Sequence, residues 1–203
     1  MARFDVLELS DTTERRLVRG LQLVLIAIGG YGLAGFDGNI VVPAILGLAI
    51  TFVPALLRRK YDNSMDWGLV LWITFAVFLH SLGSIGIYEQ YQWYDEITHT
   101  VSSALVASLG YAAFRAVELH SDEIVVPDEF HAVFIVVFVL SFGILWEVLE
   151  FAFGDFIPVY GVDDIATDMI ANTAGAVIVA VLGAGPVDGL IAFFRDRLRS
   201  DAS

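Results

Sequence analysis

Carboxylate and imidazole side chains recur at helical spacing in three apolar stretches of the chain. Intervals of three and four residues place side chains on one face of a helix. The residues concerned are Asp95 and His99, Glu147 and Glu150, and Asp164, Asp168 and Asn172. Carboxylates with one or two imidazoles suit Mg, Mn, Ca, Zn or Fe, so we predict a divalent-metal site whose metal identity is open. The predicted ligands are Asp95, His99, Glu147, Glu150, Asp164 and Asp168.

A helix cap is the alternative explanation for the acids that stand near expected helix N-termini. They are Asp95, Asp163 and Asp164. Glu147 and Glu150 lie near a helix C-terminus, where the helix dipole disfavours negative charge. His99 and Asp168 lie too far inside their apolar stretches to cap, and an acid at membrane depth costs about 2.5–3.5 kcal/mol. These four residues therefore favour an ion-binding or functional site over capping.

The same cluster contains candidates for catalysis and substrate contact. Whichever of Glu147 and Glu150 is not a metal ligand is the predicted general base, which would activate a metal-bound water. Asn172 is expected to orient a substrate. His80 is expected to reach the same depth and contact the substrate, although an interhelical hydrogen bond explains such a histidine equally well.

Six apolar segments must position these residues. Hydrophobic residues make up 57% of the 203-residue chain, and the mean hydropathy is +0.72. Each segment is close to the roughly 20 residues that a membrane-spanning helix needs. The expected spans are residues 17–35, 40–57, 68–88, 97–117, 130–153 and 165–183. We therefore expect an all-α polytopic membrane protein, a single domain over residues 1–203, with a short interfacial helix at its C-terminus.

The positive charges predict the orientation in the membrane. All eleven Lys and Arg residues flank the same side of the six spans, and such residues tend to remain in the cytoplasm. Both termini are therefore expected to be cytoplasmic in the cell membrane, with the carboxylate cluster at the outer ends of the spans. His120 and His131 flank an acidic segment on the inner side, which we expect to be a solvated loop without a site.

The charge balance narrows the choice of partners. The formal net charge is −13, and an acidic excess of this size is typical of adaptation to high salt, where screening makes self-repulsion tolerable. No nucleic-acid partner is expected, because phosphate binding needs a basic surface. The chain contains no Cys, which excludes disulfides, thiolate metal sites and Cys nucleophiles.

The region from Trp93 to Ala176 resembles the YjdF-type family of small polytopic membrane proteins and, more distantly, the VanZ-like family. The likeness is carried by Tyr94-Asp95-x-x-x-His99, by Glu147-x-x-Glu150-Phe151, and by Asp164-x-x-x-Asp168-Met169 leading to Gly175-Ala176. Glu96 and Glu150 depart from the VanZ-like pattern, which usually has a basic residue and Gln there. The resemblance implies a helical membrane fold and an envelope-related substrate.

Three functions are compatible with the sequence. The first is a metal-dependent hydrolase or transferase that acts on a membrane lipid or a lipid-linked small molecule of the envelope. The second is cation or proton transport, since acids within a membrane also mark ion pathways. The third is a non-catalytic accessory subunit whose acids bind ions for stability. The inner halves of the last three spans are almost wholly apolar, which disfavours transport.

Overall fold

The computed structural model is all-helical, with six helices long and apolar enough to cross a membrane and a short C-terminal helix. It describes residues 9–61, 65–91, 93–120, 126–152 and 161–200. The helices are α1 (Asp11–Gly35), α2 (Gly38–Tyr61), α3 (Trp67–Leu82), the π-helical turn η1 (Gly83–Ile87), α4 (Tyr88–Gln90), α5 (Trp93–Glu118), α6 (Asp128–Ala152), α7 (Val162–Leu182) and α8 (Asp188–Ser200). The predicted all-α membrane fold is confirmed. Several helices start before the predicted spans, because polar turns continue the helix beyond the apolar stretch.

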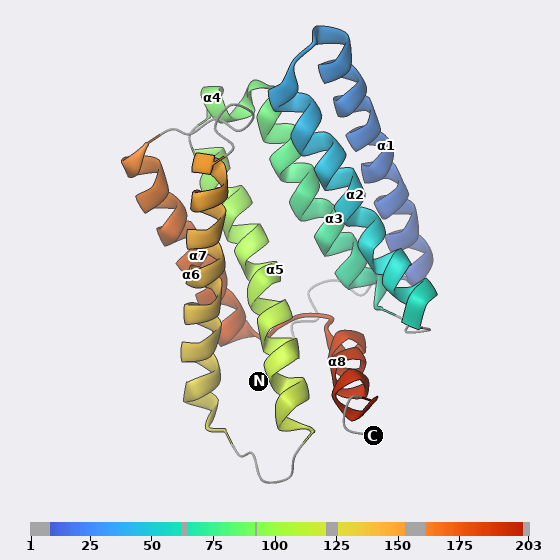
Figure 1. The fold of residues 1–203 in the computed structure, drawn as a ribbon, viewed down its shortest axis with the longest axis vertical. Coiled ribbons are helices and arrows are strands. Elements are labelled where there is room, and N and C mark those ends of the chain that lie inside the picture. Colours follow the sequence, from blue (N-terminus) through green and yellow to red (C-terminus); the bar gives the residue numbers. More distant parts are fainter. Residues whose placement is uncertain (1–8, 62–64, 92, 121–125, 153–160, 201–203) are drawn as a thin grey trace.

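The helices form two groups that meet at α3 and α5. Figure 1 shows α1, α2 and α3 as a slanted layer, with α5, α6 and α7 beside it and α8 below α3 next to the lower part of α5. We call the end with α4 and the starts of α5 and α7 the α4 end. The opposite end is the basic end, where every Lys and Arg of the described residues lies. Arg3 is outside the described residues.

The main hydrophobic core lies between α3, α5, α6, α7 and α8. Its fully buried members include Leu69 of α3, Ala107 of α5, Ile135 of α6 and Val179 of α7. The last helix also takes part, because Leu190 of α8 is only 5% exposed. The short C-terminal helix is therefore packed into the bundle through its apolar face. Outside the core, large apolar side chains such as Leu23 and Val181 are exposed, as expected for a surface that faces lipid.

Small residues let α5 and α7 approach each other closely. A Cβ atom added at Gly175 would lie 2.5 Å from the carbonyl oxygen of Thr100 and 2.9 Å from the backbone nitrogen of Ala104. The two backbones therefore leave no room for a side chain at this position, as is typical of small residues at membrane-helix interfaces. The Thr100 hydroxyl also donates a hydrogen bond of 3.3 Å to the carbonyl of Ala171 across the interface. These contacts fix the relative position of the two helices that carry the candidate site.

Candidate metal centre

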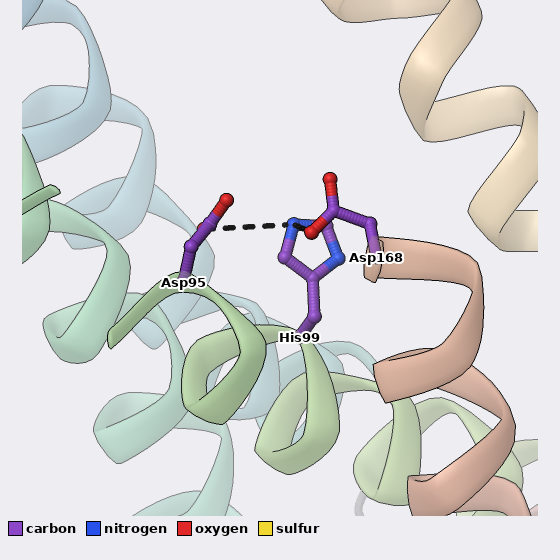
Figure 2. Close-up of side chains that lie close together, drawn as sticks. All are labelled: Asp95, His99 and Asp168. Atoms are coloured by element: carbon purple, nitrogen blue, oxygen red, sulfur yellow. Dashed lines mark ion pairs between the residues drawn. The ribbon is translucent and has the colours of Figure 1, made fainter. Parts of the chain in front are cut away.

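Three of the predicted ligands meet at the α4 end between α5 and α7. His99 Nε2 lies 3.7 Å from Asp95 Oδ1 and 3.7 Å from Asp168 Oδ1. One ligand atom from each of the three residues lies within 4.8 Å of the other two. Figure 2 shows the imidazole of His99 flanked by the two carboxylates. Asp95 and His99 share one face of α5 because they are one helical turn apart, and Asp168 comes from the facing turn of α7.

This group is largely removed from solvent, and its three side chains are not hydrogen-bonded to one another. The side chains of His99 and Asp168 are 7% and 2% exposed, and that of Asp95 is 20% exposed. The distances of 3.7 Å exceed the 2.7–3.2 Å typical of N–H···O hydrogen bonds. Within the described part of the chain, the buried Asp168 Oδ1 has no hydrogen-bond partner. A buried carboxylate oxygen without a partner is costly unless an ion, a water molecule or a proton compensates for it.

More carboxylates surround the three-residue group. Asp168 lies within electrostatic range of Asp95, Asp164, Glu147 and Glu150. Glu147 is half-buried, and its Oε1 atom has no hydrogen-bond partner among the described residues. The described Lys and Arg residues all lie at the basic end, so no permanent positive charge of this part of the chain offsets the acids. Added cations are the remaining way to neutralise them without protonation.

The predicted ligands thus divide into two sets. Asp95, His99 and Asp168 form the compact group, whereas Glu147, Glu150 and Asp164 surround it without belonging to it. We call these last three the rim carboxylates. They stand at the end of α6 and in the first turn of α7, and they remain predicted ligands for which the structure gives no compact geometry.

The two residues predicted to contact a substrate have different surroundings. Asn172 is 5% exposed, and its Nδ2 atom lies against Gly143, where an added Cβ would be only 2.8 Å away. The amide is therefore held between α7 and α6, one turn below Asp168. Both ring nitrogens of His80 are hydrogen-bonded to protein groups, Nε2 to Ser102 at 3.1 Å and Nδ1 to the hydroxyl of Tyr88 at 3.0 Å. A substrate contact of His80 would have to replace one of these bonds.

Several polar residues of the site were missed by the sequence analysis. Thr98 and Ser102 follow Asp95 at intervals of three and seven and face α3. That spacing was a usable signal, because it repeats the helical periodicity of a second polar stripe. Tyr88 gave no comparable signal, since its position depends on the irregular turn η1.

A second polar cluster lies at the basic end, where we expected a loop without a site. His131 Nε2 is 2.8 Å from Glu118 Oε2, and the same oxygen accepts a hydrogen bond of 3.1 Å from Arg115 Nη1. Glu118 and His131 are each 8% exposed, so His131, which flanks the acidic segment expected to be a solvated loop, is itself buried. We call these three residues the basic-end triad. The neighbouring residues 121–125 lie outside the described residues.

Comparison with known proteins agrees with the fold. A family model described as a predicted membrane protein, DUF2238, matches residues 17–188, which is most of the chain. The chain belongs to the DUF2238 family. The YjdF-type resemblance is thereby confirmed, because that family and DUF2238 are the same. Comparison with curated proteins and with solved structures gives no match. The matched region contains all six long apolar helices except the first turns of α1, and it contains every residue of the candidate centre.

Proposed function

We propose that this DUF2238 protein binds a divalent metal ion between α5 and α7 and uses it to act on a lipid or lipid-linked envelope substrate at the outer side of the cell membrane. The observation that carries the proposal is the trio of Asp95, His99 and Asp168. Ligand atoms about 2.0–2.2 Å from a tetrahedral zinc ion are about 3.4 Å apart. The two separations of 3.7 Å from His99 Nε2 are close to that value and need only small side-chain movements.

The donor set favours some metals over others. One imidazole with two carboxylates suits Zn, Mn or Fe better than Mg or Ca, which prefer an all-oxygen environment. Three protein ligands leave at least one coordination position for water or substrate, as in catalytic rather than structural sites. A bound ion would supply Lewis acidity and lower the pKa of that water. The acidic surroundings favour cation binding, since the trio alone has two carboxylates for one imidazole.

One of the rim carboxylates would act as the general base. Glu147 or Glu150 would accept the proton of the attacking water and later donate it to the leaving group, which is the role of a general base in hydrolysis. Both stand in the last turn and a half of α6, beside the exposed apolar residues Val148 and Leu149. This position is compatible with a substrate whose chain lies in the membrane and whose reacting group reaches the carboxylates.

The orientation is part of the proposal and follows from the positive-inside rule. The basic end faces the cytoplasm, and the α4 end with the metal centre faces outward. The middle of the bundle favours a site over an ion pathway, because the buried core of α5 and α6 between the two ends is largely apolar and includes Leu105, Ala112, Ile135 and Val139. Ser108 of α5 and Thr74 of α3 are buried polar residues near this depth, and each donates a hydrogen bond to the backbone of its own helix. Cation or proton transport is thus less well supported than an outward-facing enzyme.

Calorimetric titration tests metal binding. The protein, purified in detergent and stripped of metals, would be titrated with Zn²⁺ and with Mn²⁺, next to Asp168→Asn and Asp163→Asn. Asp163 is the matched control, because it is an acid of the same helix that is exposed and outside the trio. We expect one saturable site in the wild type and in Asp163→Asn and none in Asp168→Asn. Equal binding by all three proteins, or no binding by the wild type, would contradict the proposal.

A further inference from the structure

The third of the long apolar helices is broken at the α4 end, close to the candidate centre, and Tyr88 follows this break. In η1 the residues Ile85 and Gly86 leave the helical conformation, and Gly86 has a φ of 105°, a region that favours glycine. The ring of Tyr88 lies over Gly83, where an added Cβ atom would overlap it. Single π-helical turns inside α-helices are frequent at functional sites. Here the turn places a tyrosine hydroxyl inside the bundle.

The Tyr88 hydroxyl joins a chain of side chains that ends on Asp95. His80 Nδ1 is 3.0 Å from the hydroxyl, which is 3.4 Å from Thr98 Oγ1. The Thr98 hydroxyl then donates to Asp95 Oδ1 at 3.2 Å and shares this proton with the Asp95 carbonyl oxygen at 2.8 Å. At the other end of the chain, Ser102 Oγ lies 3.1 Å from His80 Nε2. Thr98 is fully buried and Tyr88 is partly buried.

Each hydroxyl has one proton to donate, and this fixes the direction of the hydrogen bonds along these side chains. The Thr98 hydroxyl donates its one proton to Asp95, so Thr98 can only accept a hydrogen bond from Tyr88. Tyr88 then donates its hydroxyl proton to Thr98 and accepts a hydrogen bond from the protonated Nδ1 of His80. The neutral ring of His80 then accepts at Nε2 from Ser102. Every member of the chain is satisfied in one direction, with Asp95 as the final acceptor.

We infer that Tyr88 is a positioning residue for the candidate metal centre, holding Asp95 through Thr98 in the orientation that binds the ion. The inference rests on the proposed metal binding. In this inference, His80 and Ser102 hold Tyr88 in place, and the irregular turn η1 brings Tyr88 into the site. Residues that orient metal ligands from the second layer typically change metal affinity by about 10–100-fold when removed.

Tyr94 provides a matched control for Tyr88. Its hydroxyl also donates a hydrogen bond of 3.0 Å, but to the backbone carbonyl of Leu79 and not to the chain that ends on Asp95. The two rings are in contact, with centroids 5.7 Å apart. Tyr88→Phe and Tyr94→Phe therefore each remove one hydroxyl from the same aromatic pair. Only Tyr88→Phe interrupts the support of Asp95.

The test compares Zn²⁺ affinity and melting temperature of wild type, Tyr88→Phe and Tyr94→Phe in the same detergent. We expect Tyr88→Phe to weaken Zn²⁺ binding about 10-fold or more and Tyr94→Phe to change it less than about twofold, with similar small losses of metal-free melting temperature. Equal affinities of the two variants would overturn the inference and leave metal binding intact. A wild type that binds no Zn²⁺ would overturn metal binding and the inference with it.

Thr98 allows an independent test if Tyr88→Phe does not fold. Thr98→Val removes the hydroxyl and keeps the shape of the side chain, whereas Thr98→Ser keeps the hydroxyl. We expect Thr98→Val to lose about as much Zn²⁺ affinity as Tyr88→Phe, Thr98→Ser to retain the wild-type affinity, and the double variant to lose no more than either single one, because the two residues act in series. Additive losses, or a loss in Thr98→Ser equal to that in Thr98→Val, would contradict the inference.

Discussion

Both ends of α5 carry carboxylate and imidazole side chains, but these side chains are hydrogen-bonded to one another at the basic end only. At the basic end Glu118 is bound by His131 at 2.8 Å and by Arg115 at 3.1 Å. At the α4 end His99 lies 3.7 Å from each of two carboxylates, with no described Lys or Arg beside them. The two clusters are separated by roughly 35 Å along the helix at about 1.5 Å per residue.

The two clusters differ in how their carboxylate charge is balanced, and this property distinguishes a structural cluster from a binding site. In the basic-end triad, one carboxylate oxygen accepts two hydrogen bonds from cationic or neutral donors of the protein, so its charge is balanced internally. In the candidate metal centre, the carboxylates outnumber the imidazole and Asp168 Oδ1 has no hydrogen-bond partner among the described residues. We propose that an outside cation completes the second arrangement, whereas the first has no need of one.

The largest expected effect concerns the candidate metal centre. Removing one of three ligands costs more than the about 10–100-fold of a supporting residue, so His99→Ala should weaken Zn²⁺ affinity more than about 100-fold. The measurement is competition with a chelator of known affinity. Glu118→Ala is the counterpart at the other end, and it should leave Zn²⁺ affinity within about twofold. A similar loss in both variants would mean that the two ends are coupled or that the assay reports folding.

The basic-end triad should show the opposite behaviour. Glu118→Gln removes a charged acceptor from two hydrogen bonds, each worth about 1.5–3 kcal/mol when a charged group takes part. Glutamine keeps a neutral acceptor, which retains about half of each bond, and Arg115 is 41% exposed, so we expect the free energy of unfolding to fall by about 2 kcal/mol. Thermal or denaturant unfolding in detergent measures it. Unchanged stability would show that the triad is not the structural cluster described above.

Ligand-induced stabilisation distinguishes the two clusters in one experiment. A ligand that binds only the folded state at 100 times its dissociation constant stabilises it by about 2.7 kcal/mol. Zn²⁺ should therefore raise the melting temperature of the wild type and of Glu118→Gln, although the latter starts from a lower value. It should not raise that of His99→Ala. A rise in all three proteins would indicate metal binding elsewhere in the chain.

The smallest effects are expected for the rim carboxylates. Glu147→Gln and Glu150→Gln each remove one nearby negative charge, which is worth about 1 kcal/mol at most across water-like surroundings, or roughly fivefold in affinity. Titration with Zn²⁺ should thus show a loss of about two- to fivefold for each. A loss as large as that of His99→Ala would instead make the mutated residue a ligand, as its position in the sequence predicted.

The long helices and part of the candidate site could be predicted from the sequence. Apolar length predicts the spans, and intervals of four residues predict that Asp95 and His99 face the same way and that Asp168 lies at the same end. These features depend on one helix at a time. The prediction of a single domain and that of adaptation to high salt stay predictions, because they concern properties that one fold does not test.

The features that depend on how helices pack could not be predicted. Whether Glu147 or His99 is nearest to Asp168 depends on the rotation of α6 and α7 about their axes, which is set by contacts such as that of Gly175 with the backbone of α5. The pairing of Glu118 with His131 depends on the offset between α5 and α6 at the basic end. The position of Tyr88 depends on an irregular turn that no periodic pattern indicates.

We propose that one metal ion is held jointly by α5 and α7 at the α4 end. Anomalous diffraction from crystals of the Zn²⁺-loaded protein, recorded at the zinc absorption edge, tests it most directly. We predict a single strong peak about 2.0–2.2 Å from His99 Nε2 and from a carboxylate oxygen of both Asp95 and Asp168. Loaded crystals without a peak between these residues, or with one at the rim carboxylates alone, would contradict the account.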